Sequence, residues 1–388
     1  PMHFNSAMIL LVMSLLFLLG GYWAESAVLD PQCVPQMKIP THGFSISWPL
    51  WSVFLFIMLY MAYLNYRDFL YVASQVTNET ELSKMLGPVN NGFAHRVIEL
   101  GRWNAYRFRF AMALSYVSVL AVCINVVVHQ YKEVLKWSCF IALFLPFMVL
   151  TGGRQQFMYL VIYSMITFFL VYRKYNWGKN SLGKETMIIG IALVSFLIFF
   201  IGIGVINGKI GLDKGIFRVL VHYAGTNISA FDVFINEMTV PDGNYIGTTT
   251  LVPIYSFLHN HGVDVPQFFQ YITRFTALGP VTTNVYTAFY RYINDFGYTG
   301  CAILMLLIGF LYTFLYRKMY VLGLKNWMIL VYASNVYPIF LMGREERFFN
   351  EILTTSRVSF IVLLILLYKF LVLCQYLVQP KMKISPLH

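Results

Sequence analysis

The sequence has 388 residues, of which 58% are hydrophobic and only 12% are charged, and its formal net charge is +11. So few charged side chains cannot cover the surface of a soluble globular protein, and the five cysteines give no disulfide framework or metal cluster. The excess of Lys and Arg does not indicate a nucleic-acid partner, because in an integral membrane protein these residues mark the cytoplasmic loops.

About nine apolar runs predict helices that cross a bilayer, since roughly 20 apolar residues span its hydrocarbon core. In chain order they lie near residues 7–23, 46–65, 108–128, 137–152, 155–172, 186–206, 297–316, 326–342 and 358–378. Such continuous runs exclude a β-barrel, whose strands alternate apolar and polar residues. The sequence therefore predicts an all-α, polytopic transmembrane fold of about 9–11 spans, with residues 1–388 as one integral membrane domain. The first run follows Met2 without a basic region or a cleavage site, so we expect it to be retained.

Basic clusters orient the C-terminal half of the chain. The cluster at 173–184 predicts a cytoplasmic loop, which places residues 207–296 on the opposite side as a large periplasmic segment. The cluster at 317–325 returns to the cytoplasm, and residues 343–357 then face out again. Counting the runs back from the cluster at 173–184 places residues 67–107 outside. These residues carry several basic side chains, which would instead favour the cytoplasm. Either the N-terminus lies outside, or one apparent run does not cross.

The segment 207–296 is the first candidate site, because short turns would suffice to connect spanning helices. Apolar residues at helical spacing over 217–231 predict an amphipathic helix in the membrane interface. Residues 282–297 combine aromatic rings, which stack on sugar faces, with Asn, Asp and Arg groups, which bond hydroxyls; an aromatic belt is the alternative. The candidate residues of this segment are His222, Tyr223, Asp232, Arg274, Asn284, Tyr286, Arg291 and Asp295.

Two shorter segments are further candidates. The turn Gly152-Gly153-Arg154 presents a planar guanidinium that suits a pyrophosphate at the bilayer surface, or that simply anchors a helix end. Residues 343–349 carry Arg344 and Arg347 for a phosphate and Glu346 as a base, or form a self-neutralised helix start. No P-loop, Rossmann glycine pattern, HExxH or GxSxG occurs, which excludes an ATP-driven pump on this chain and most soluble-type hydrolases.

These segments together resemble the Wzy-type O-antigen polymerases, which polymerise oligosaccharide repeat units. The resemblance covers residues 150–320 and rests on the Gly-Gly-Arg turn, Tyr223 with Phe231-Asp232, and Asn284-Val285-Tyr286-Thr287 followed by Asp295-Phe296-Gly297 and Gly300. It implies a multi-pass glycosyltransferase of the bacterial inner membrane, with a GT-C-like helical body and a periplasmic active face. Such an enzyme transfers a growing glycan from undecaprenyl pyrophosphate onto a lipid-linked repeat unit, in lipopolysaccharide O-antigen or related surface polysaccharide biosynthesis.

The resemblance also implies roles for the candidate residues. Lipid pyrophosphate is the leaving group, so we expect no cofactor and no metal. Arg154 is the first candidate to bind the pyrophosphate, supported by Arg291, Arg274, Arg344 and Arg347. Asp295, Glu346 and His222, in that order, are candidate bases, and Asp295 as a helix N-cap is the structural alternative.

The expected partners are lipid-linked oligosaccharides, membrane lipids and a polysaccharide chain-length regulator, with no nucleic acid. Two other functions stay open at this point: an O-antigen ligase-type transferase, and a flippase or transporter for a lipid-linked sugar. The sequence shows no convincing internal repeat and few charged residues within the runs, which disfavours a transporter.

Overall fold

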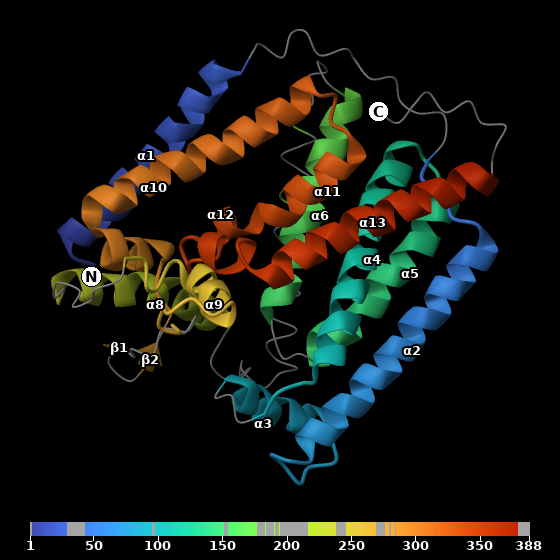
Figure 1. Ribbon diagram of the computed structural model, residues 1–388, viewed down its shortest axis with the longest axis horizontal. Helices are drawn as coiled ribbons and strands as arrows, with labels where there is room; N and C mark the ends of the chain where they lie inside the picture. Colours follow the sequence, from blue (N-terminus) through green and yellow to red (C-terminus); the bar gives the residue numbers. More distant parts are fainter. Residues whose placement is uncertain are drawn as a thin grey trace. The chain divides into compact units, whose positions relative to one another are not determined.

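The computed structural model describes residues 2–28, 43–94, 98–150, 154–176, 216–237, 246–268, 276–278, 281–283 and 285–378, together with residues 183, 190 and 194. These residues are mostly helical, and the chain divides into two compact units (Figure 1). The first unit comprises residues 1–34, 217–322 and 335–359, and the second comprises 35–216, 323–334 and 360–388.

The first unit contains α1 (Phe4–Ala27), α8 (Ile216–Asn236), α9 (Val252–Asn260), α10 (Ala288–Val321), α12 (Tyr337–Leu341), the π-helical turn η3 (Phe348–Ile352) and an antiparallel hairpin of β1 (Thr276–Leu278) and β2 (Val281–Thr283). The second unit contains α2 (Trp48–Ala73), α3 (Leu82–Ala94), α4 (Arg102–Val127), α5 (Tyr131–Leu150), α6 (Arg154–Asn176) and most of α11 (Asn326–Asn335) and α13 (Thr355–Val378).

Seven helices of the described residues are long and apolar enough to cross a membrane: α1, α2, α4, α5, α6, α10 and α13. They confirm an all-α polytopic fold. The predicted run near 186–206 lies almost entirely outside the described residues. The run near 326–342 is not one helix, because α11 and α12 meet at a break at Val336. Pro338 explains the break, since it has no N–H for the carbonyl four residues earlier.

Close glycine contacts hold α1 against α10 in the first unit. A Cβ built on Gly20 would lie 2.1 Å from the Leu306 carbonyl oxygen, and one on Gly309 would lie 2.0 Å from that of Phe17. Small residues allow this approach of backbones, which stabilises helix pairs within a bilayer. Further along, Gly21 faces Thr313 and Glu25 pairs with Arg317, so the two helices run parallel (Figure 1).

The second unit is built around α4. Most of its span is buried, whereas α2 and α13 expose much of their apolar surface. The rings of Tyr116 on α4 and Tyr163 on α6 stack with centroids 4.0 Å apart, and the Tyr163 hydroxyl donates to the Tyr116 carbonyl at 2.7 Å. A helix buried on all sides needs such internal partners for its polar groups, because no water reaches them. The outer helices therefore present their apolar faces to lipid.

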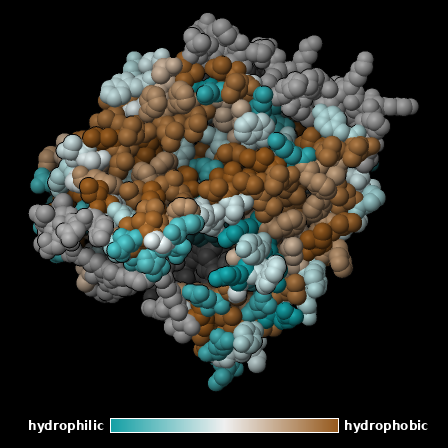
Figure 2. All heavy atoms as spheres, viewed as in Figure 1, coloured by the Kyte–Doolittle hydropathy of each residue, from teal (hydrophilic) through white to brown (hydrophobic). Residues whose placement is uncertain are grey.

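The surface of the first unit separates polar from apolar residues. Figure 2 shows apolar atoms along α10, whereas hydrophilic residues gather around α9. α8, which follows the sequence-predicted amphipathic pattern over 217–231, is a helix but is not among the candidate spans of the described residues. It carries an apolar stripe and buries Ala230, Phe231 and Phe234.

Candidate functional site

A buried polar network of the first unit joins three segments far apart in sequence. They are the start of α10, the turn at residues 246–250 and the segment 343–352 around η3. Asp295 lies within α10, where its carboxylate accepts hydrogen bonds from the backbone N–H groups of Thr249 (3.0 Å) and Thr250 (2.6 Å) and from the Thr249 hydroxyl (3.0 Å). It thus caps the turn at 246–250, and not α10, whose N-cap position belongs to Thr287.

A backbone carbonyl of the same turn accepts two further hydrogen bonds. The carbonyl oxygen of Thr249 accepts hydrogen bonds from Nη1 of Arg291 and, at 3.1 Å, from Nδ2 of Asn350. Arg291 is 9% exposed and Asn350 is 3% exposed. A buried guanidinium is retained only when its hydrogens find acceptors, so this carbonyl fixes where the charge of Arg291 lies.

Glu346 is the most deeply buried acid of the network, with 3% exposure. One oxygen accepts from the Tyr292 hydroxyl (3.2 Å) and the Phe349 N–H (2.7 Å), and the other accepts from the N–H (3.1 Å) and side-chain amide (2.5 Å) of Asn350. Burial raises the pKa of Glu346, although these donors and the nearby Arg291 charge act against the rise. Glu346 therefore holds the backbone of η3 in place.

Two further arginines flank Glu346. Arg347 bonds Glu345 and Glu351, each at 2.6 Å, and its side chain is 24% exposed. Arg344 lies 3.8 Å from Glu345 through Nε, and its side chain is 37% exposed. Arg347 is therefore held by two carboxylates, whereas Arg344 is the cation of this group that solvent reaches most easily.

The other predicted residues of the first unit lie at separate positions. Asp232 on α8 accepts from the His3 backbone (3.1 Å) and lies 2.9 Å from its ring Nδ1. Burial opposes ionisation of Asp232, but Ser6 and His3 outweigh it and lower its pKa. Tyr286 is buried, shares a hydrogen bond of 2.5 Å with the Thr276 hydroxyl, and stacks on Tyr290 with centroids 4.3 Å apart. Tyr286 is thus part of the core below the hairpin.

Several predicted residues cannot be compared with the network. Arg274 and Asn284 lie outside the described residues, as do Gly152 and Gly153. His222 and Tyr223 lie within α8, and Arg154 is the first residue of α6, but in each case only the backbone is described. Arg154 belongs to the second unit, whereas Asp295, Arg291 and the arginines of segment 343–347 belong to the first.

The sequence analysis missed four members of the network: Thr249, Thr250, Tyr292 and Asn350. Each contributes a hydroxyl, an amide or a backbone group, which has no distinctive sequence pattern. Within the described residues, no group of three or more His, Cys, Asp and Glu side chains could hold a metal ion.

The fold and these contacts define the class of this chain: a polytopic α-helical membrane protein with a buried polar network at the start of one long helix. In comparisons with protein-family models, curated proteins and solved structures, nothing matches this chain.

Proposed function

We propose that this chain is an inner-membrane glycosyltransferase that polymerises oligosaccharide repeat units carried on undecaprenyl pyrophosphate. The observation that supports the proposal best is the convergence of Arg291 and Asp295 with the 343–351 segment. Arg291, Asp295 and residues 343–349 were selected as candidates from sequence alone, and the Thr249 carbonyl, Asn350 and Tyr292 join them in one buried network. Burying several ionisable groups is costly, so such clusters mark functional sites more often than chance.

The arrangement suits a lipid-pyrophosphate donor. When the glycosidic bond to the pyrophosphate breaks, negative charge grows on the leaving oxygen, and fixed positive charge stabilises it. Arg344 supplies an accessible guanidinium, while Glu345 and Glu351 hold Arg347 in a fixed orientation beside it. The planar fork of Arg344 matches phosphate oxygens. The Thr249 carbonyl accepts from Arg291, and uncharged donors from Tyr292 and Asn350 hold Glu346 in place.

The packing of α1 on α10 bears on the orientation that basic clusters left open. Because the two helices run parallel, the N-terminus lies on the same side as the start of α10. The contact between His3 and Asp232 joins the N-terminus to α8 on that side. In the proposed orientation this is the periplasmic face, so the N-terminus is periplasmic. Of the two alternatives left open by the basic clusters, this packing supports the one in which the start of the chain lies outside.

The test is complementation of a host strain that lacks the gene, followed by gel electrophoresis of its lipopolysaccharide. Wild type should restore a ladder of polymer lengths, and Arg344→Ala should leave core plus a single repeat at equal membrane level. Arg67→Ala is the matched control, since that side chain is 64% exposed on α2. Bare core without a single-repeat band in the deletion strain would instead indicate failed ligation or export, and would reject the polymerase.

A further inference from the structure

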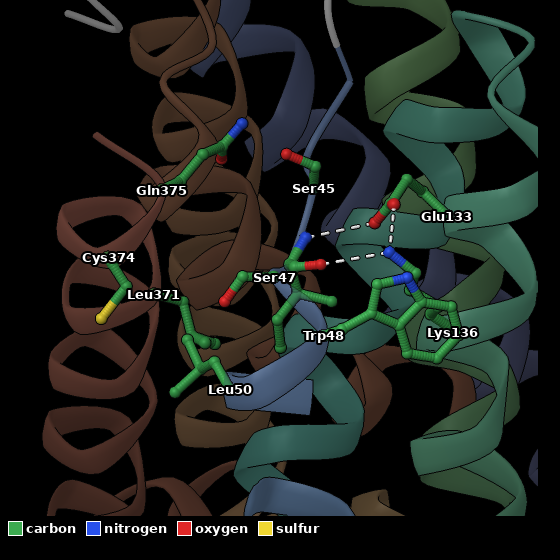
Figure 3. Close-up of a pocket in the computed structure, with 10 residues that line it drawn as sticks. Ser45, Ser47, Trp48, Leu50, Glu133, Lys136, Leu371, Cys374 and Gln375 are labelled. Atoms are coloured by element: carbon green, nitrogen blue, oxygen red, sulfur yellow. Dashed lines mark hydrogen bonds and ion pairs between the residues drawn. The ribbon is translucent and has the colours of Figure 1, made fainter. Parts of the chain in front are cut away.

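A small pocket in the second unit has no part in the proposed chemistry. Ten residues line it: Ser45, Ile46, Ser47, Trp48, Leu50, Glu133, Lys136, Leu371, Cys374 and Gln375 (Figure 3). They come from the extended segment before α2 and its first turn, the first turns of α5 and the last turns of α13. All three helices are candidate membrane spans, and the pocket lies at their ends. It therefore occupies the depth at which lipid headgroups meet the acyl region.

The polar end of this pocket is a preorganised ion pair. Nζ of Lys136 lies 2.6 Å from Oε1 of Glu133, and both side chains are less than one-fifth exposed. The backbone of Ile46 bridges them: its N–H donates to Glu133 at 3.1 Å, and its carbonyl accepts from Lys136 at 3.2 Å (Figure 3). The ammonium also lies 4.7 Å from the centroid of the Trp48 ring, a favourable cation–π contact.

The other end of the pocket is apolar and continues onto lipid-facing surface. Leu50 and Leu371 lie at this end, away from Ser45 and Gln375 (Figure 3). Beside it, exposed apolar side chains follow α2 and α13, and the Phe54 and Phe370 rings contact each other across the two helices with centroids 6.4 Å apart. An occupant can therefore place a polar group in the pocket and an acyl chain along these helices.

The size and charge of the pocket select the occupant. Its volume of about 180 Å³ is below the roughly 300–1,000 Å³ of typical small-molecule sites, which is too small for an oligosaccharide and sufficient for a lipid headgroup. Its two charges cancel, so an anionic headgroup gains no net attraction. A headgroup with one phosphate and one ammonium can instead pair with Lys136 and Glu133 respectively.

From these observations we propose that this pocket is a binding site for a zwitterionic phospholipid with a primary ammonium headgroup, such as phosphatidylethanolamine. The phosphate bonds Lys136, the ammonium bonds Glu133, and one acyl chain lies along α2 and α13. This site is independent of the proposed glycosyltransferase activity, because it uses none of the residues assigned to that activity.

Native mass spectrometry of the purified full-length chain tests the proposal, with phosphatidylethanolamine, phosphatidylglycerol and soluble glycerophosphoethanolamine added in turn. We expect wild type to retain phosphatidylethanolamine about tenfold better than phosphatidylglycerol. Cys374→Trp fills the pocket from α13 without touching the ion pair, and should lower this retention about tenfold. Cys139→Trp is the matched control, since Cys139 is half-buried on α5 and does not line the pocket.

A second variant separates binding from folding. Glu133→Gln leaves Lys136 as the only charge, so the preference should reverse towards phosphatidylglycerol, a result that misfolding cannot produce. Equal retention by wild type and Cys374→Trp would overturn the proposal, as would an unchanged preference in Glu133→Gln. Binding of glycerophosphoethanolamine as tight as that of the lipid would show a site for a free headgroup, and would overturn the role of the acyl chain.

Discussion

His3 and Asp232 contact each other although they lie 229 positions apart in the chain, with Nδ1 of His3 2.9 Å from Oδ2 of Asp232. The pair joins the segment before α1 to α8. Asp232 keeps its charge more readily than an ordinary aspartate, because its pKa is lowered. The contact therefore stabilises the first unit only while this carboxylate is ionised.

Asp232→Asn should lower the free energy of unfolding by about 1 kcal/mol at neutral pH. A lowered folded pKa means that the stabilisation is present above the unfolded pKa of 3.8 and is lost as pH falls through the folded value. Thermal unfolding in detergent should thus show the wild-type advantage disappearing in acid. Asp264 is an exposed acid of the same unit, so Asp264→Asn should change neither the free energy of unfolding at neutral pH nor its dependence on pH.

The Glu346 carboxyl should make stability depend on pH in the opposite direction to Asp232, and Glu346→Gln removes this dependence. Because burial raises the pKa of Glu346, its favourable contribution is complete below the unfolded value of 4.5 and is lost as pH rises through the folded value. The free energy of unfolding of the wild type should therefore fall relative to that of the variant as the pH is raised from about 4 to about 8. The exposed Glu79→Gln should run parallel to wild type, and a parallel course for Glu346→Gln would contradict the burial of this charge.

Asp295→Ala should destabilise the chain by about 3 kcal/mol, because two backbone N–H groups and a hydroxyl of the turn lose a charged acceptor. Asn294→Ala removes one donor to the same carboxylate at 3.3 Å and should cost less than 1 kcal/mol, or about one-third as much. Denaturant unfolding of both variants measures the difference. Equal losses would show that the carboxylate does not hold the turn.

Arg344→Ala and Arg347→Ala should fail in different ways. Arg344 is the accessible cation, so its loss should reduce polymer synthesis about 100-fold with an unchanged unfolding midpoint. Arg347 is held by Glu345 and Glu351, so its loss leaves two carboxylates without their shared cation and should lower the midpoint. Parallel measurement of lipopolysaccharide length and thermal unfolding distinguishes the two effects, and identical behaviour would remove the special role of Arg344.

Gly309→Ala should separate α1 from α10, because the new methyl group would meet the Phe17 carbonyl at 2.0 Å. Overpacking of this kind costs about 1–3 kcal/mol. Gly343→Ala is the control, since nothing lies within 4 Å of the added Cβ. In detergent, the thermal unfolding midpoint of the control should equal that of wild type and lie well above that of Gly309→Ala.

Local sequence patterns predicted where the helices lie better than they predicted which residues contact each other. Apolar length alone located the seven spanning helices of the described residues, and helical spacing located α8. The predicted run began at Gly297, and in the structure a separate helical stretch, Ala288–Phe296, precedes it within α10. In the structure Gly297 has φ 66° and ψ −175°, a non-helical conformation that glycine adopts at low cost, and it forms a kink between two helical stretches of α10.

The network around Thr249 could be predicted only in part. The charged members Arg291, Asp295 and Glu346 stood out because ionisable residues are rare in this sequence. Thr249 and Asn350 did not, since a backbone carbonyl and a side-chain amide 101 positions apart in the chain meet only after the chain has folded. Pairings of this range depend on tertiary packing, which one sequence does not encode as a local pattern.

The glycine contact between α1 and α10 also sets an order of events during synthesis. Leu306 leaves the ribosome about 290 residues after Gly20, and at roughly 5–20 residues per second this is a wait of about 15–60 s. During that time α1 is already in the membrane without the helix that will cover its glycines. The first unit is therefore completed late, and a newly made chain passes through a period in which α1 is open to pairing with other membrane helices.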